Sequence, residues 1–257
     1  MPAHNNSNRA FRLLIRFVWG GALRRLAGAC GLLLITSGFS AQAQPLPSAA
    51  DLQRLAPSAS LSALKLALTA YQCASLTAPG QATSSKLLTV IDYSKPSRDK
   101  RLWVFDLKQK KLLFEEWVAH GKNSGDDMAT SFSNTPNSYQ SSIGLYQTGE
   151  TYSGKHGRSL RLLGLEPGFN DNSQSRAIVM HAAAYADPKV VPGLGRLGRS
   201  QGCPAVRPAI AGKLIDTLKT GSYVFAYYPQ EKWLNTSRYL GAQTCPATGQ
   251  TLAVSQQ

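Results

Sequence analysis

A series of short apolar runs, rich in β-branched and aromatic residues, limits what this chain can fold into. Each run has the length of a strand, and turn-forming residues separate it from the next. The runs cover residues 87–92, 102–107, 112–119, 143–148, 159–163, 177–181 and 222–228. Because the runs do not alternate with helical patterns, a doubly wound parallel sheet is not expected. The pattern instead predicts a single, mainly β domain.

Two amphipathic helices are expected beside the strands. Apolar residues recur at three- and four-residue intervals over residues 60–74 and again over residues 209–218. The first helix is expected to pack on the main domain, with docking of a partner as the alternative. Residues 44–58 read as a loose lead-in and residues 229–257 as a polar tail. Residues 120–137 lack periodicity, and a loop of that length inside a compact domain is often functional.

Residues 1–43 have the pattern of a signal peptide. A run of arginines precedes an apolar stretch over residues 26–35, and Ala41-Gln42-Ala43 supplies the small residues of a cleavage site. The sequence therefore predicts an exported protein, located in the periplasm or cell wall, with cleavage before Gln44.

Two other interpretations of this segment fit the sequence less well. A lipoprotein box around Cys30 would lie at the start of the apolar stretch rather than at its end. An uncleaved anchor would need ~20 apolar residues, which is more than the stretch contains. Since no other segment is long and apolar enough, we expect no transmembrane segment in the mature chain.

The charge of the chain favours an anionic partner. It carries 28 Lys and Arg against 14 Asp and Glu. Removal of the signal peptide takes away five arginines and no acid, which leaves 23 basic residues and a net charge of +9. For an exported protein this favours an anionic wall or membrane surface over nucleic acid, for which the sequence has no motif. The alternative is that the charge only maintains solubility.

The mature chain keeps Cys73, Cys203 and Cys245, an odd number for an oxidising compartment. Cys73 and Cys245 lie near opposite ends of the chain and are candidates for a disulfide. That pairing would leave Cys203 as a free, reactive thiol. In the alternative, Cys203 is disulfide-bonded and one of the other two cysteines is free.

Cys203 and His181 are the candidates for chemistry. His181 ends the buried run over residues 177–181, and a Gly/Pro-rich loop leads from there to Gly202-Cys203. A cysteine acts as a nucleophile only after losing its proton, and His181 would be the base that removes it. Gly202 lets a substrate carbonyl approach, and the N–H groups of Gly202 and Cys203 would stabilise its oxyanion.

The neighbouring arginines fit the same interpretation. Arg199 and Arg207 would favour the thiolate and could bind a substrate carboxylate. Simpler roles stay open, with His181 as a core histidine and Arg199 as a solvated loop residue. The histidines are too far apart for a metal motif, and a phosphate-binding Gly-rich loop is missing. We therefore expect no metal and no cofactor.

Several motifs in one order resemble the catalytic domain of bacterial murein L,D-transpeptidases, in its divergent Ser-x-Gly-Cys branch. They are Trp117-Val118-Ala119-His120-Gly121, Phe132-Ser133-Asn134, Ser141-Ser142-Ile143-Gly144-Leu145-Tyr146, Tyr152-Ser153-Gly154-Lys155-His156-Gly157, Gly164-Leu165-Glu166 and Arg199-Ser200-Gln201-Gly202-Cys203-Pro204-Ala205-Val206. The resemblance covers most of residues 87–228. Many members have His in place of Gln201 and Arg or Asn in place of Pro204-Ala205, so the choice of donor or acceptor could differ.

The resemblance implies a fold and a domain organisation. Residues 87–228 are expected to form an L,D-transpeptidase-like β-sandwich catalytic domain. Residues 44–86 precede it as a lead-in and helix, a short helix follows the catalytic loop, and residues 229–257 form the tail.

The resemblance also implies a reaction. Cys203 would attack the carbonyl of the third residue in a peptidoglycan stem tetrapeptide, expel the terminal D-alanine and form a thioester. The amine of a second stem would then give a 3→3 crosslink, whereas water would give carboxypeptidase activity. His181 would act as base and then acid, oriented by a backbone carbonyl that maps to Ser200. His120 and Tyr146 are cleft candidates for substrate binding, with a structural role as the alternative for His120.

Two other functions remain open on the same scaffold. One is a hydrolase that removes D-alanine or releases wall-attached protein, and the other is a non-catalytic wall-binding domain. Peptidoglycan stem peptides are the expected partner.

Overall fold

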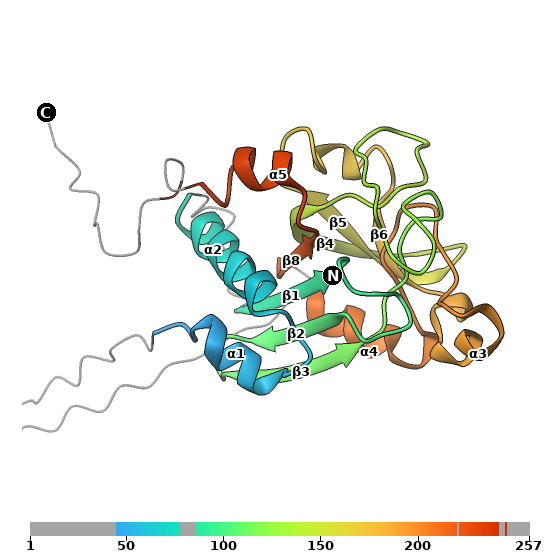
Figure 1. Cartoon of the computed structure of the whole chain (residues 1–257), viewed down its shortest axis with the longest axis horizontal. Helices are drawn as coiled ribbons and strands as arrows, with labels where there is room; N and C mark the ends of the chain where they lie inside the picture. The colour runs from blue at the N-terminus through green and yellow to red at the C-terminus, as the bar shows by residue number, and fades with distance from the viewer. Residues whose placement is uncertain (1–44, 78–85, 220, 242–244, 246–257) are drawn as a thin grey trace, which may run out of the picture. The chain divides into compact units, whose positions relative to one another are not determined.

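The computed structural model describes residues 45–77, 86–219, 221–241 and 245 (Figure 1). The predicted signal peptide, over residues 1–43, lies outside the described residues. Among the residues described, none of the helices is both long and apolar enough to span a membrane.

The strands form one eight-stranded sheet with the order β3-β2-β1-β8-β4-β5-β6-β7. They are β1 (Leu87–Asp92), β2 (Leu102–Asp106), β3 (Lys111–Glu116), β4 (Gly144–Gly154), β5 (Gly157–Gly164), β6 (Val179–Ala182), β7 (Ala205–Val206) and β8 (Tyr223–Tyr227). Most neighbours are antiparallel, while β1 with β8 and β6 with β7 are parallel. The predicted mainly β fold is confirmed, and each of the predicted runs forms a strand.

The sheet curls until its two ends meet. Ala119, just after edge strand β3, forms an antiparallel bridge to Ala205 in β7 at the opposite edge. Gly121 and Ser200 form a second bridge nearby. The expected sandwich is therefore made from one continuous, barrel-like sheet, and the closing seam runs directly beside Cys203.

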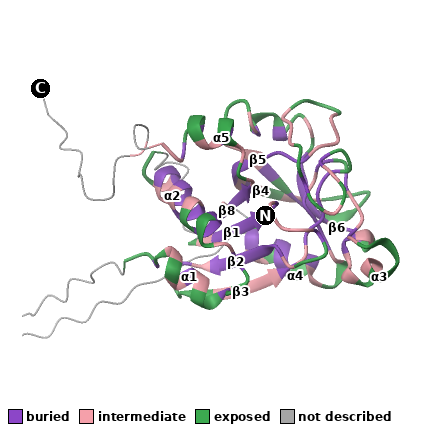
Figure 2. Ribbon diagram, in the orientation of Figure 1, coloured by how far each residue is buried: buried purple, intermediate pink, exposed green. Residues whose placement is uncertain are grey.

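Each face of the sheet carries its own hydrophobic core. Along β2, Trp103 and Phe105 belong to one core while Leu102 and Val104 belong to the other, as the two-residue period of a strand requires. Helices α1 (Ala49–Leu55), α2 (Leu61–Thr77) and α5 (Glu231–Thr236) pack on the first core, and α4 (Pro208–Leu218) packs on the second (Figures 1 and 2). Burial of each large apolar side chain stabilises the fold by about 2 kcal/mol.

The two predicted helices are confirmed as α2 and α4. The lead-in is less loose than expected, because Ser48 caps α1 and exchanges hydrogen bonds with Asp51 in a capping box. The expected tail likewise contains α5, whose Trp233 is fully buried. Both helices are too short to show a clear apolar period in the sequence.

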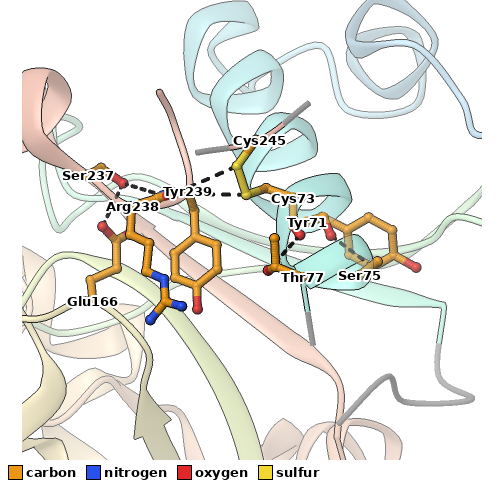
Figure 3. The surroundings of a disulfide bond; sticks show 9 residues. All are labelled: Tyr71, Cys73, Ser75, Thr77, Glu166, Ser237, Arg238, Tyr239 and Cys245. Atoms are coloured by element: carbon orange, nitrogen blue, oxygen red, sulfur yellow. Dashed lines mark hydrogen bonds between the residues drawn. A yellow bond between two sulfur atoms is a disulfide. The ribbon is translucent and has the colours of Figure 1, made fainter. Parts of the chain in front are cut away.

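The C-terminal segment is attached to the body at two points. Cys73 of α2 is bonded to Cys245, as predicted, and the carbonyl of Arg238 lies beside both sulfurs (Figure 3). The carboxylate of Glu166 accepts hydrogen bonds from Trp233 Nε1 at 3.0 Å and Ser237 Oγ at 2.6 Å. Among the described cysteines, this leaves Cys203 as the free thiol.

Candidate active site

His181 lies on β6 between the two strands that frame the site. Its backbone pairs with Ser159 of β5 on one side and with Ala205 of β7 on the other. The ring atom Nδ1 is 2.9 Å from the carbonyl oxygen of Ala182. Because a carbonyl can only accept, Nδ1 carries the proton and Nε2 keeps its lone pair. The ring is therefore held in the tautomer that a base requires.

The surroundings of His181 keep it neutral. Burial lowers the pKa of His181, and the nearby His156 and Lys155 lower it further, against the opposing effect of the Ala182 carbonyl. The ring of His156 stacks on that of His181 with 4.3 Å between centroids. At neutral pH the imidazole is thus ready to take a proton.

Cys203 lies against the beginning of β6. Its sulfur accepts a hydrogen bond from the N–H of Val179 at 3.4 Å and donates toward the carbonyl of Ala177 at 3.7 Å. Burial raises the pKa of the Cys203 thiol, while the Val179 N–H, Arg176 and Lys155 oppose that shift. The thiol is therefore protonated at rest and needs a base before it can attack.

The turn before Cys203 is held by Ser200. Its hydroxyl accepts from the N–H of Gly202 at 3.0 Å and donates to the carbonyl of Cys203 at 2.6 Å. Gly202 has a φ of 120°, and a Cβ there would lie 2.8 Å from the carbonyl oxygen of Gln140. Only glycine fits this position without strain. Since the N–H of Gly202 is already bonded, the N–H of Cys203 is the better oxyanion donor of the two predicted ones.

A cleft of about 460 Å³ opens over both residues. Its lining includes Lys155, Arg176 and Arg199 but, among the described residues, no Asp or Glu. The volume is in the range of small-molecule and peptide sites. A cleft with this charge attracts anionic groups.

Comparison with known protein families matches residues 55–227 to the L,D-transpeptidase catalytic domain. The chain belongs to this L,D-transpeptidase family. A comparison with curated proteins gives no significant match.

Solved structures of L,D-transpeptidases are distant neighbours. An L,D-transpeptidase from Mycobacterium smegmatis has 14% identity and a TM-score of 0.36, over 56% of this chain and 59% of that one. L,D-transpeptidase 3 from Mycobacterium tuberculosis has 15% identity and a TM-score of 0.33, over 56% and 61%. An L,D-transpeptidase from Xylanimonas cellulosilytica has 16% identity and a TM-score of 0.32, over 72% and 99%. This chain thus matches about three fifths of the mycobacterial ones.

The site residues predicted from the sequence do not all reach the cleft. Cys203, His181, Ser200 and Arg199 line it, whereas His120, Tyr146 and Arg207 are not part of its lining. Tyr146 is buried, and its hydroxyl donates to the carbonyl of Ser142 at 3.1 Å. Arg207 forms a two-point ion pair with Glu116 at 2.7 and 2.8 Å.

The side chain of His120 lies in the protein interior, away from the cleft. It is fully buried, and its Nδ1 accepts a hydrogen bond from Nη2 of Arg101 at 2.7 Å. Its carbonyl accepts from the N–H of Ser200 at 2.8 Å. His120 therefore helps to hold the turn before Cys203 in place through its backbone carbonyl.

Two expected contacts differ in the structure. The carbonyl that orients His181 belongs to Ala182, while that of Ser200 accepts from the N–H of Lys122 at 2.8 Å. The cations that act on the Cys203 thiol are Arg176 and Lys155. Arg199 instead bonds the carbonyl of Gly125 at 2.8 Å.

Lys155, His156 and Arg176 are the site residues that sequence reasoning missed. Lys155 and His156 form the tip of the β4–β5 hairpin and lie inside a quoted motif, so that motif could have suggested them. Arg176 lies in the turn-rich link before β6, and its isolated position in the sequence carried no signal.

Proposed function

We propose that the mature protein is an exported L,D-transpeptidase that uses Cys203 to act on peptidoglycan stem peptides. The observation that carries this proposal is a free thiol and a neutral histidine of fixed tautomer that line one cationic cleft, in which the described residues include no Asp or Glu. Family membership supports the reaction type, and the disulfide fits an oxidising compartment. The signal-peptide pattern of residues 1–43 supports export.

The reaction would begin with proton transfer from the thiol to the imidazole. The thiol of Cys203 turns from the carbonyl of Ala177 toward Nε2 of His181, which takes its proton. The thiolate then attacks the carbonyl carbon of the third stem residue, and the N–H of Cys203 donates to the oxyanion that forms.

Collapse of the tetrahedral intermediate would release D-alanine. The C–N bond to D-alanine breaks, the imidazolium returns its proton to the leaving amine, and a thioester remains on Cys203. An amine of a second stem then attacks the thioester and gives its proton to His181. The C–S bond breaks as the new C–N bond completes the 3→3 crosslink, and the Cys203 thiolate takes the proton back from His181. The free carboxylates of a stem peptide match a cleft that has Lys155 at its rim and no Asp or Glu among the described residues of its lining.

The proposal is tested with the mature, disulfide-bonded protein and a purified stem tetrapeptide. Release of D-alanine and a thioester mass adduct on Cys203 are expected, and both should vanish in C203A. Dimeric products would indicate an amine acceptor, whereas tripeptide alone would indicate water. If the protein forms neither adduct nor product while its Cys203 thiol is reduced, the proposed enzymatic activity is refuted. Full turnover by C203A would refute the assignment of Cys203 as the nucleophile.

A further inference from the structure

Arg176 has an unusual set of hydrogen bonds for a cleft arginine. Its Nη1 donates to the carbonyl of Ser133 at 2.7 Å and to the hydroxyl of Ser142. Its Nη2 donates to the carbonyl of Gln140 at 2.7 Å and to the hydroxyl of Ser138 at 3.2 Å. All of these acceptors are neutral, so the side chain is held in place while its charge stays unbalanced.

That charge lies beside Gly202, in the turn that carries Cys203. Nη2 of Arg176 is 3.4 Å from the point where a Cβ on Gly202 would stand, and Gly202 is the residue before Cys203. The guanidinium is half-buried, and burial lowers the pKa of Arg176 without removing its charge at neutral pH. In a partly desolvated position, a fixed charge acts more strongly than one in water.

In the part of the chain that the structure describes, the other groups that act on the Cys203 sulfur carry no negative charge that would cancel the effect of Arg176. Lys155 is the second cation that acts on Cys203, and it lies at the more exposed hairpin tip. The phenols that interact electrostatically with the thiol are neutral, because burial raises the pKa of Tyr93 to about 12, that of Tyr185 to about 12, and that of Tyr146 further still. His181 is neutral at rest. A thiolate would therefore meet cations and neutral groups.

We propose that Arg176 is a positioning residue that stabilises the Cys203 thiolate electrostatically. The same side chain holds the 133–142 segment against the nucleophile turn, which comprises residues 200–203. When the S–H bond breaks, the proton moves to Nε2 of His181 and a negative charge develops on sulfur. A cation already fixed beside the turn that carries Cys203 lowers the energy of the charged state without further reorganisation.

Direct binding of substrate by Arg176 is less consistent with the geometry. Its Nη hydrogens already point at protein oxygens, which leaves only Nε–H for a ligand. Lys155 has no ion-pair or hydrogen-bond partner among the described residues and is better placed for a substrate carboxylate. The role of Arg176 in turnover rests on the proposed function, but its effect on the thiol can be measured without substrate.

The test is the pH dependence of alkylation of the Cys203 thiol by iodoacetamide, followed by intact mass on the disulfide-bonded protein. Wild type is compared with R176Q, which loses the charge, and R176K, which keeps it. R161Q is the matched control, since Arg161 lies over the ring of the cleft residue Tyr152 and does not act on the thiol. Circular dichroism melting establishes that each variant is folded.

We expect the alkylation midpoint of R176Q to rise by about one pH unit, so that the rate near pH 7 falls about tenfold. R176K and R161Q should stay near wild type. A folded R176Q with the wild-type midpoint would overturn the inference, and so would R176K with a rise as large as that of R176Q. If R176Q does not fold, the alkylation midpoint of R176K decides. A wild-type midpoint supports the electrostatic role of Arg176, and a rise of one pH unit refutes that role. An upward shift in a protein that releases no D-alanine would leave this inference standing and refute the proposed function.

Discussion

At the scale of single residues, His181 is the group on which turnover should depend most visibly. Its Nδ1 proton is held by the Ala182 carbonyl, which leaves Nε2 as the proton acceptor. We expect H181Q to lower the rate of D-alanine release by about 10²–10⁴-fold, because glutamine cannot shuttle the proton. The matched control is H156Q, which removes the stacked neighbour and keeps the base. An H181Q rate within a few-fold of wild type would contradict the assignment.

The pH dependence of D-alanine release by the wild-type protein should depend on the same histidine. The environment depresses the pKa of His181 below its ordinary value of 6.5, burial being the main cause. As the pH falls, activity is retained until the imidazole becomes protonated, so the acidic limb should have its midpoint below pH 6.5. Measurement of kcat/KM against pH checks this expectation, and an acidic midpoint above 6.5 would contradict it.

His120 should make stability pH-dependent. Burial, assisted by Arg101, lowers the pKa of His120 from 6.5 to about 4. Because Nδ1 accepts from Arg101, a proton there would face the guanidinium. The folded state therefore binds this proton less readily than the unfolded state, and stability is lost as the pH falls from about 6.5 towards 4, by on the order of 3 kcal/mol in all.

The test compares urea unfolding of wild type and H120Q between pH 7 and pH 4. Glutamine keeps an acceptor for Arg101 and does not titrate, so the wild type should lose stability relative to H120Q as the pH falls. Other buried groups, including Asp92, Glu166 and His181, titrate in both proteins and cancel in the difference. A difference that stays constant with pH would show that His120 titrates normally.

At the scale of elements, hydrogen bonds within the turn over residues 200–203, and one across the closing seam, fix the position of Cys203. Ser200 bonds Gly202 and Cys203 through its hydroxyl and His120 through its backbone. We expect S200A to reduce stability by about 1–2 kcal/mol and to lower kcat more than it raises KM, because the turn loosens while the cleft walls remain. S175A is the matched control, since Ser175 lines the cleft but bonds Asn172 outside the turn. Equal effects of the two substitutions would argue against a special role for Ser200.

The strands were predictable because their apolar runs are strong local signals. His181 became a candidate because it ends such a run, and Cys203 because it is the odd cysteine of the mature chain. The remaining site residues depend on contacts between distant segments. Arg176 acquires its role from acceptors in the 133–142 segment, which no local pattern connects to it. The two-residue strand β7 pairs with segments that are distant in the sequence. Its contacts with Ala119 and His181 therefore could not be predicted from Ala205 and Val206 alone.

At the scale of the whole molecule, the disulfide and Glu166 attach the C-terminal segment to the face of the sheet that is covered by α1, α2 and α5 (Figure 3). This face carries the first hydrophobic core, whereas Cys203 packs against the second. Stability of the chain and chemistry at the cleft should therefore be separable by removal of the disulfide.

The Cys73–Cys245 bond closes a loop of sequence separation 172, so its loss should destabilise the fold by about 2–4 kcal/mol. The comparison is made in a C203S background, where the absence of a free thiol prevents exchange, between C203S and C73S/C245S/C203S in urea unfolding. With Cys203 present, C73S/C245S should release D-alanine at the wild-type rate well below its melting temperature. Without reductant, iodoacetamide should label Cys203 alone, and with reductant it should label Cys73 and Cys245 as well. Labelling of all three before reduction, or equal stability of the two C203S proteins, would show that the bond does not hold the C-terminal segment to α2.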